Sequence, residues 1–356
     1  MLGVLIALVV TVVVAHLILK NYKAQTVLFA GGIVLMALSI ILGTGGQILP
    51  AKQSTGFVWF DIFKFMERIF SSRAAGLGLI IMAVAGFARY MDKIGASKAL
   101  VKICVKPLEK FHAPYAVLAL GYIVGQILNI FIPSASGLGV LLMVTMYPIL
   151  VNLGVSKLAA TAMIGTAACL DLGPASGNAV LAAKNANLDV AIYFTEYQIP
   201  VSIVVMITIA VLHYFVQQWF DKKEGHVVVR STAAVQTAAS VETEDLPPNI
   251  YAILPIIPLV LILVFSKLVI ASIKMDVVTA MFIGIAISML FEYFRHRDAK
   301  KVFSSIQVFF DGMGTQFAAV VTLIVAGETF AQGLMTIGAI DSIINFAQTG
   351  VLVKVQ

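Results

Sequence analysis

Long apolar segments separated by short polar ones run along most of this chain. Most approach the roughly 20 residues that a helix needs to cross a bilayer, and they cover residues 1–19, 26–43, 74–91, 114–132, 138–152, 157–170, 193–218, 250–271, 277–291 and 315–335. Segments of this length and glycine content are unlike the strands of a membrane barrel, which alternate over about ten residues. The pattern predicts an all-α polytopic membrane protein with about ten apolar segments.

The composition agrees with this interpretation. Of the 356 residues, 60% are hydrophobic and 12% are charged, and the mean hydropathy is +0.99. The net charge of +6 does not indicate a nucleic-acid partner, because the basic residues lie in short loops where they set membrane topology. Counting crossings places four basic clusters together on the cytoplasmic side: residues 20–23, 89–110, 222–223 and 295–301.

The chain lacks the sequence features of a secreted or catalytic protein. The first apolar run has no basic residue before it and no small-residue cleavage pattern after it, so we predict a membrane helix rather than a signal peptide. Cys104 and Cys169 are solitary, which favours free thiols packed as small hydrophobes. No nucleophile elbow, zinc-protease motif or phosphate loop occurs. We therefore expect neither an enzyme nor a metal or organic cofactor.

An internal repeat is visible in two ten-residue stretches. FARYMDKIGA at 87–96 and FAQGLMTIGA at 330–339 share five positions at an offset of 243 residues. The count of crossings puts the two copies at opposite membrane faces, which predicts the inverted repeats of many secondary transporters. We expect a first transmembrane repeat at 1–218, a cytoplasmic linker at 219–249 and an incomplete second repeat at 250–356.

Two stretches rich in Gly, Pro and Ser interrupt the apolar segments of the first half. They read IPSASGLG at 132–139 and DLGPASGN at 171–178. Inside a membrane, irregular backbone is tolerated only where protein or a water-filled cavity receives it. The short apolar arms beside these stretches predict a re-entrant hairpin at the first and a discontinuous helix at the second.

The same two stretches carry the candidate binding chemistry. A broken helix exposes N–H groups where its second half begins, and the helix dipole there favours a carboxylate. Asp171 and nearby carbonyls are candidates to hold a proton or cation. The candidate substrate- and ion-binding residues are Ser134, Ala135, Ser136, Gly137, Asp171, Pro174, Ser176, Gly177 and Asn178. The alternative is that the small residues only allow helices to pack closely.

Other polar residues in apolar surroundings are weaker candidates. Asn129 precedes the first interruption and either lines the same cavity or makes an interhelical hydrogen bond. Glu328 lies within an apolar segment, where an ionisable residue is a functional candidate. The amphipathic segment 57–70 is expected to lie in the outer membrane interface.

Three stretches resemble the anaerobic C4-dicarboxylate carriers of the DcuC/DcuD family, within the broader ion transporter superfamily: SASGLGVLLMVTMYPILVNLGVSKLAA at 134–160, DLGPASGNAVLAA at 171–183 and FDKKE at 220–224. The resemblance runs from Met1 to about Thr349. It implies transport of succinate, fumarate, malate or aspartate across the inner membrane, by exchange or proton-linked movement during anaerobic growth.

In that superfamily, a hairpin tip and an unwound helix from each half bind substrate and coupling ion. By resemblance, residues 134–137 match the tip and residues 174–178 match the unwound segment. The Gly-Ser-Gly-Asn loop of the family's second half does not occur here, so the resemblance implies a C-terminally truncated member.

Several alternatives stay open at this point. The chain is a carrier of C4-dicarboxylates, a carrier of another small organic anion or an amino acid, or an inactive truncated fragment. From a different class, a membrane-embedded enzyme or an inactive assembly partner remains. The expected partners are the dicarboxylate and the lipid bilayer; coupling to H⁺ or Na⁺ and assembly as a homodimer are both compatible with the sequence.

Overall fold

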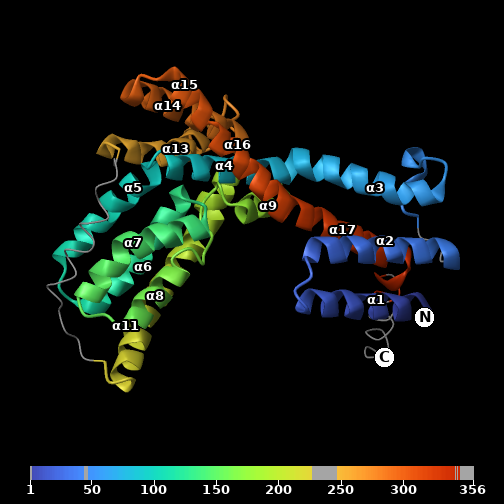
Figure 1. Cartoon of the computed structure of the whole chain (residues 1–356), viewed down its shortest axis with the longest axis horizontal. Helices are drawn as coiled ribbons and strands as arrows, with labels where there is room; N and C mark the ends of the chain where they lie inside the picture. The colour runs from blue at the N-terminus through green and yellow to red at the C-terminus, as the bar shows by residue number, and fades with distance from the viewer. Residues whose placement is uncertain (1, 44–46, 227–246, 341, 343, 345–356) are drawn as a thin grey trace. The chain divides into compact units, whose positions relative to one another are not determined.

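The computed structural model describes residues 2–43, 47–226, 247–340, 342 and 344, and within these ranges the chain is helical with no strand (Figure 1). Eight helices, some joined end to end, are long and apolar enough to cross a membrane. The prediction of an all-α polytopic membrane protein is confirmed at this level. The spans are Leu2–Leu19, Ala24–Leu42, Val58–Lys93, Pro114–Phe131, Ala135–Asn152, Val190–Lys223, Val277–His296 and Ala299–Thr336.

Several spans are composed of shorter helices that join through tighter or wider turns. In chain order, the elements up to the second interruption are α1 (Leu2–Leu19), α2 (Ala24–Leu42), η1 (Ala51–Gln53), α3 (Val58–Arg73), η2 (Ala74–Gly78), α4 (Leu79–Lys93), α5 (Ala96–Val105), η3 (Lys106–Lys110), α6 (Pro114–Phe131), α7 (Ala135–Asn152) and α8 (Lys157–Thr166). The remainder are α9 (Gly177–Asn185), α10 (Val190–Ile192), η4 (Tyr193–Gln198), α11 (Ile199–Lys223), η5 (Asn249–Ile256), α13 (Ile257–Val264), α14 (Val277–His296), α15 (Ala299–Ser305), α16 (Gln307–Gln316), η6 (Phe317–Val321) and α17 (Thr322–Thr336).

Three parts of the sequence-based segmentation can be compared with these elements. The predicted amphipathic segment 57–70 lies in α3, which meets α4 at the wide turn η2, where Gly76 has a non-helical φ of −94° and ψ of −113°. The apolar run 157–170 contains only the 10-residue helix α8. Residues 219–223 of the predicted linker belong to α11, and residues 227–246 lie outside the described residues. The count of about ten apolar segments was therefore too high for the described spans.

The chain forms two compact units, which we call unit 1 and unit 2. Unit 1 consists of Met1–Leu79 and Thr315–Gln356, and unit 2 consists of Ile80–Gly314. Unit 1 thus pairs α1, α2 and α3 with α17 from the far end of the chain, and α17 packs along both α2 and α3 (Figure 1). In unit 2, the helices α6, α7, α8 and α11 lie side by side and α5 packs against η5 (Figure 1).

Glycine allows the closest helix contacts in both units. In unit 1, a Cβ on Gly32 would lie 2.6 Å from the Thr329 carbonyl oxygen, and one on Gly31 would lie 3.0 Å from the Phe330 ring. In unit 2, a Cβ on Gly284 would lie 2.8 Å from the Phe87 ring. Small residues that let backbones approach are the usual device of membrane helix packing, since lipid provides little hydrophobic driving force between helices.

Candidate functional site

Both interruptions predicted from the sequence are present in unit 2. The first separates α6 from α7 at residues 132–134, and the second separates α8 from α9 at residues 167–176. Pro133 lacks an amide hydrogen and disfavours helical backbone at Ile132, whose φ and ψ are −119° and 79°. In the second break, Gly173 has a φ of +113° and Asp171 a φ of +46°, which a side-chain-bearing residue seldom adopts. The first break lies within the predicted stretch, whereas the second begins earlier than predicted, after Thr166, and ends before Gly177.

The Asp171 carboxylate organises the second break. Its Oδ2 accepts a hydrogen bond from Ser176 Oγ at 2.7 Å and another from Asn178 Nδ2 at 2.6 Å. Ser176 is also the N-cap of α9, because its Oγ accepts from the Ala179 amide at 3.3 Å. Three of the predicted binding residues, Asp171, Ser176 and Asn178, are therefore brought together. In this arrangement the Asp171 carboxylate is already hydrogen-bonded by donors of the protein itself.

Two amide side chains tie the breaks to neighbouring helices. Asn129, 2% exposed, donates to the Ile132 carbonyl at 3.4 Å in the first break, and its Oδ1 accepts from the Leu172 amide at 3.3 Å in the second. Gln198 donates to the Asp171 carbonyl and accepts from the Gly173 amide, both at 3.3 Å. Asn129 therefore connects the two irregular segments directly. The sequence left open whether Asn129 lines a cavity or makes an interhelical hydrogen bond, and its hydrogen bonds to the two breaks were not foreseen.

The sequence analysis did not identify Gln198. It lies in the π turn η4 at the start of α11, and π turns inside helices are frequent at functional sites. The available signal was a polar amide two residues before Pro200 at the beginning of an otherwise apolar run. Its pairing with the second break was not visible, because 25 residues separate Gln198 from Gly173.

Polar side chains from two other helices hold the end of α8. Gln126 of α6 is fully buried and donates to the Thr166 carbonyl at 2.7 Å. His213 of α11 places Nε2 2.8 Å from the Thr166 hydroxyl. A Cβ on Gly125 would lie 2.7 Å from the Ala167 Cβ, so α6 and the start of the second break approach closely. The end of α8, after which the second break begins, is therefore held by α6 and by α11.

The first break contributes a helix start and one wall of a cavity. Ser134 is the N-cap of α7, with its Oγ accepting from the Gly137 amide at 3.2 Å. A cavity of about 520 Å³ lies between α7 and α8 and is lined by Ala135 and Ser136 on one side and by Cys169 on the other. The prediction that both cysteines are packed is wrong for Cys169, whose side chain is exposed.

The two helix starts present backbone donors. Within the described part of the chain, the amides of Ala135, Ser136, Gly177 and Asn178 donate to no recorded acceptor. The first turn of a helix has orphan N–H groups and a positive partial charge, so it attracts anions. Among the residues that the structure describes, no three His, Cys, Asp or Glu side chains gather in a metal-binding group. The arrangement is suited to a small carboxylate held by amides and hydroxyls.

Not every candidate residue is at these breaks. Glu328 lies in unit 1, where its carboxylate is 2.6 Å from the Arg73 guanidinium, with the two side chains 30% and 40% exposed. Pro174 is buried inside the second break, and no hydrogen bond of the described residues joins Ser136 to Asn178. The assignment of the nine residues as a binding site stays a prediction.

Comparisons with known proteins agree with the sequence resemblance. A family model described as C4-dicarboxylate anaerobic carrier, DcuC, matches residues 2–355. The chain is 38% identical over 346 residues to the anaerobic C4-dicarboxylate transporter DcuC of Escherichia coli K12, covering 96% of this chain and 72% of that protein. It is 37% identical over 350 residues to a protein of Vibrio cholerae named probable anaerobic C4-dicarboxylate transporter DcuC, covering 98% and 74%. No solved structure matches the chain.

Proposed function

Since the chain belongs to the DcuC family of C4-dicarboxylate anaerobic carriers, we propose that the two helix breaks of unit 2 bind the C4-dicarboxylate that it transports. The family consists of membrane carriers and not of enzymes, and the eight apolar spans fit a multi-pass protein of the bacterial inner membrane. Succinate, fumarate and malate are the substrates that the family name supports best.

The observation that carries this proposal is the pair of helix breaks that Asn129 joins, each of which is followed by a helix start. Four unbonded amides and the hydroxyl of Ser136 lie where α7 and α9 begin. Broken helices whose N-termini point at an anionic substrate group recur in secondary transporters. A dianion with two carboxylates has two ends to satisfy, so one helix start for each carboxylate matches its chemistry.

The proposed coupling group is Asp171. Its carboxylate occupies the Ser176 hydroxyl and the Asn178 amide, which are donors that a substrate carboxylate would use. Binding of H⁺ or Na⁺ to Asp171 would withdraw the negative charge from this contact and free those donors. Exchange and proton-linked transport are both compatible with this arrangement.

We also propose that the chain contains two related repeats, with boundaries at 1–218 and 250–356 around the linker. Support comes from features that recur at the offset of 243 residues. The π turn Ala74–Gly78 corresponds to the π turn Phe317–Val321, and each leads into a 15-residue helix, α4 or α17. Gly95 and Gly338 follow these helices, and both have a φ of +77°.

Helix contacts inside the two units support the same correspondence. Gly31 of α2 meets Phe330 of α17 in unit 1, and Gly284 of α14 meets Phe87 of α4 in unit 2. The phenylalanines are 243 residues apart and the glycines 253. Each repeat therefore contributes the glycine of one contact and the phenylalanine of the other, as expected when two repeats exchange helices. The opposite membrane orientation of the repeats rests on the count of basic loops.

Exchange of labelled succinate in proteoliposomes tests the site. Ser136→Ala and Asn178→Ala should each abolish or strongly reduce exchange. Thr208→Ala is the matched control, because Thr208 is exposed on α11 and its hydroxyl bonds only the Val204 carbonyl of its own helix, at 2.8 Å. Normal exchange by both site variants would remove the assignment.

Competition experiments in the same vesicles test the substrate class. We expect unlabelled fumarate and malate to compete with succinate. Acetate and neutral amino acids should compete poorly, because each of them presents only one carboxylate to the two helix starts. Stronger competition by a monocarboxylate would favour a carrier of another small anion.

A further inference from the structure

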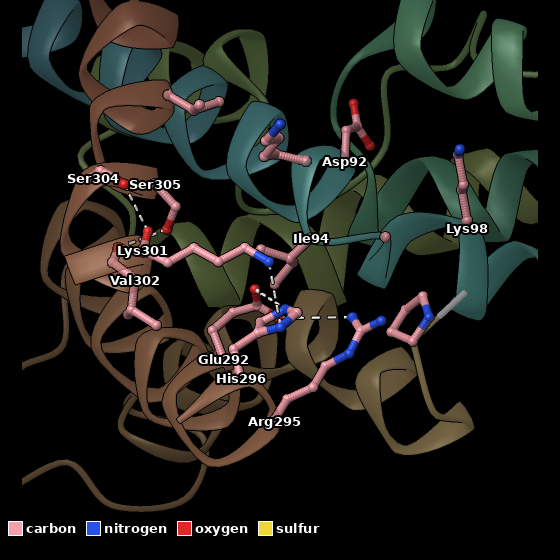
Figure 2. A pocket seen from close by; sticks show the side chains of 14 residues that line it. Asp92, Ile94, Lys98, Glu292, Arg295, His296, Lys301, Val302, Ser304 and Ser305 are labelled. Atoms are coloured by element: carbon pink, nitrogen blue, oxygen red, sulfur yellow. Dashed lines mark hydrogen bonds and ion pairs between the residues drawn. The ribbon is translucent and has the colours of Figure 1, made fainter. Parts of the chain in front are cut away.

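Unit 2 contains a second cavity, which we call the charged pocket (Figure 2). It has a volume of about 710 Å³ and lies where α4 ends and α5 begins, beside the end of α14 and the helix α15. Lys93 is the last residue of the Val58–Lys93 span and His296 is the last of the Val277–His296 span. The pocket therefore lies at the ends of two spanning helices, and its Asp92 also borders the first helix break, with Oδ2 3.2 Å from where a Cβ on Gly137 would lie.

Positive charge predominates in this pocket. Its cationic and ionisable nitrogen side chains are Lys93, Lys98, Arg295, His296 and Lys301, and its acids are Asp92 and Glu292. Lys93, Lys98 and Lys301 are exposed, and none forms an ion pair with an acid of the described residues. The ammonium groups of Lys93 and Lys98 are available to a ligand, and that of Lys301 has further N–H donors beyond its contact with His296 Nδ1.

One of the two pocket acids, Glu292, is already paired. Glu292, 7% exposed, lies 3.4 Å from His296 Nε2 and 3.9 Å from the Arg295 guanidinium. At the other ring nitrogen of His296, Nδ1, Lys301 Nζ lies 3.5 Å away. Lys301, His296 and Glu292 therefore form the row visible in Figure 2. Glu292 therefore positions basic side chains and does not repel an anion from the pocket mouth.

The proposed repeat allows the charged pocket to be compared with the corresponding part of unit 1. That part contains apolar side chains instead. The pocket residues Ser305 and Val308 correspond to Ile62 and Phe65 at the 243-residue offset. In unit 1, Ile48 and Leu49 pack against these side chains and form an apolar core with them. The connection between α2 and α3 covers residues 43–57 and supplies Ile48 and Leu49, whereas only residues 297–298 join α14 to α15.

This comparison shows that the helix arrangement does not itself require a charged cavity. One copy is closed by apolar side chains, whereas the other has a short connection and retains several lysines. Basic side chains held close together around a cavity repel one another unless an anion screens their charge.

We propose that the charged pocket binds a phosphate group, carried by an anionic phospholipid headgroup or by a soluble phosphate. Lysine ammonium groups bind phosphate as point charges, and the volume lies within the range of small-molecule sites. The position at the ends of two spanning helices is where headgroup phosphates lie, and anionic lipids attract basic segments there. The lysines of α4, α5 and α15 would then be held together by one ligand.

Lipid titration of the full chain tests this proposal. In nanodiscs of phosphatidylcholine, added phosphatidylglycerol should raise the melting temperature, and native mass spectrometry should detect retained phosphatidylglycerol. The double variant Lys98→Gln/Lys301→Gln should weaken binding by about tenfold for each lysine removed, since one charge-assisted contact is worth roughly that factor. A separate titration with inorganic phosphate in pure phosphatidylcholine discs distinguishes the soluble source from the lipid.

The matched control is Lys106→Gln/Lys110→Gln. It removes the same charge from exposed positions on the same basic segment, outside the pocket lining. Lys98→Arg/Lys301→Arg should retain binding and shows that the pocket variants fold. Equal weakening by both glutamine pairs, no stabilisation by either phosphate source, or stabilisation by succinate alone would overturn the proposal. Succinate exchange, measured in parallel, reports on the helix breaks independently.

Discussion

The cross-link made by Asn129 leads to a quantitative prediction. Asn129→Leu keeps the approximate volume of the side chain and removes both of its hydrogen bonds, which join the Ile132 carbonyl and the Leu172 amide at 3.4 and 3.3 Å. Each buried backbone group left unsatisfied costs about 1–3 kcal/mol, but interhelical hydrogen bonds in membranes average about 0.6 kcal/mol. Because both bonds are long, we expect the lower part of the combined range, about 1–3 kcal/mol.

Hydrogen–deuterium exchange of the second break measures this loss. A loss of 1–3 kcal/mol from local opening raises amide exchange by about 5- to 150-fold, and this increase should be confined to peptides that cover residues 167–180. Thr145→Val is the control, because the Thr145 hydroxyl bonds only the Leu141 carbonyl of its own helix, at 2.7 Å. If exchange in the second break stays within twofold of the unsubstituted protein, Asn129 does not connect the two breaks energetically.

Three further substitutions test other contacts. Asp171→Asn removes the charged acceptor of two hydrogen bonds worth about 1.5–3 kcal/mol each, so thermal stability should fall; an unchanged melting temperature would exclude Asp171 as the organising acid. Asp276→Ala should lower the unfolding free energy by about 1 kcal/mol at neutral pH, through loss of the α14 cap. Burial raises the pKa of Asp276, but hydrogen bonds from Thr279 outweigh burial and lower the pKa below 3.8. The stabilisation by the cap is therefore complete above pH 3.8 and is lost as the pH falls through the lowered pKa. Melting curves at several pH values would show this loss. Gly32→Ala places a Cβ 2.6 Å from the Thr329 oxygen and should destabilise the protein by about 1–3 kcal/mol, whereas Gly139→Ala meets nothing within 4 Å and should melt normally.

Local signals predicted the helix interruptions well. Pro133 and the run from Asp171 to Asn178 carry residues whose backbone preferences act within one or two positions, and the structure breaks its helices there. The all-α membrane class followed from segment length and hydropathy for the same reason. Both properties depend on neighbouring residues and need no knowledge of the tertiary fold.

Contacts between distant segments could not be predicted in the same way. The pairing of Gln198 with Asp171 and Gly173 requires two helices to meet that the apolar pattern treats as independent. The similarity between residues 87–96 and 330–339 was visible in the sequence, yet it did not reveal that α17 packs with α2 inside unit 1. Similar apolar faces fit many neighbours in lipid, so the choice among them depends on glycine contacts such as that of Gly32 with Thr329.

The hydrogen bonds of Asp171 suggest why an acid lies next to a site proposed for anions. A fixed carboxylate beside a dianion would normally oppose binding, but here it holds the Ser176 hydroxyl and the Asn178 amide at 2.7 and 2.6 Å. On the proposed mechanism, substrate and Asp171 compete for those donors, and a cation on Asp171 changes the outcome in favour of the substrate. Thermodynamic reciprocity then requires the substrate to tighten cation binding by the same factor. Asp171→Asn should therefore remove the dependence of substrate affinity on H⁺ or Na⁺, even if some affinity remains.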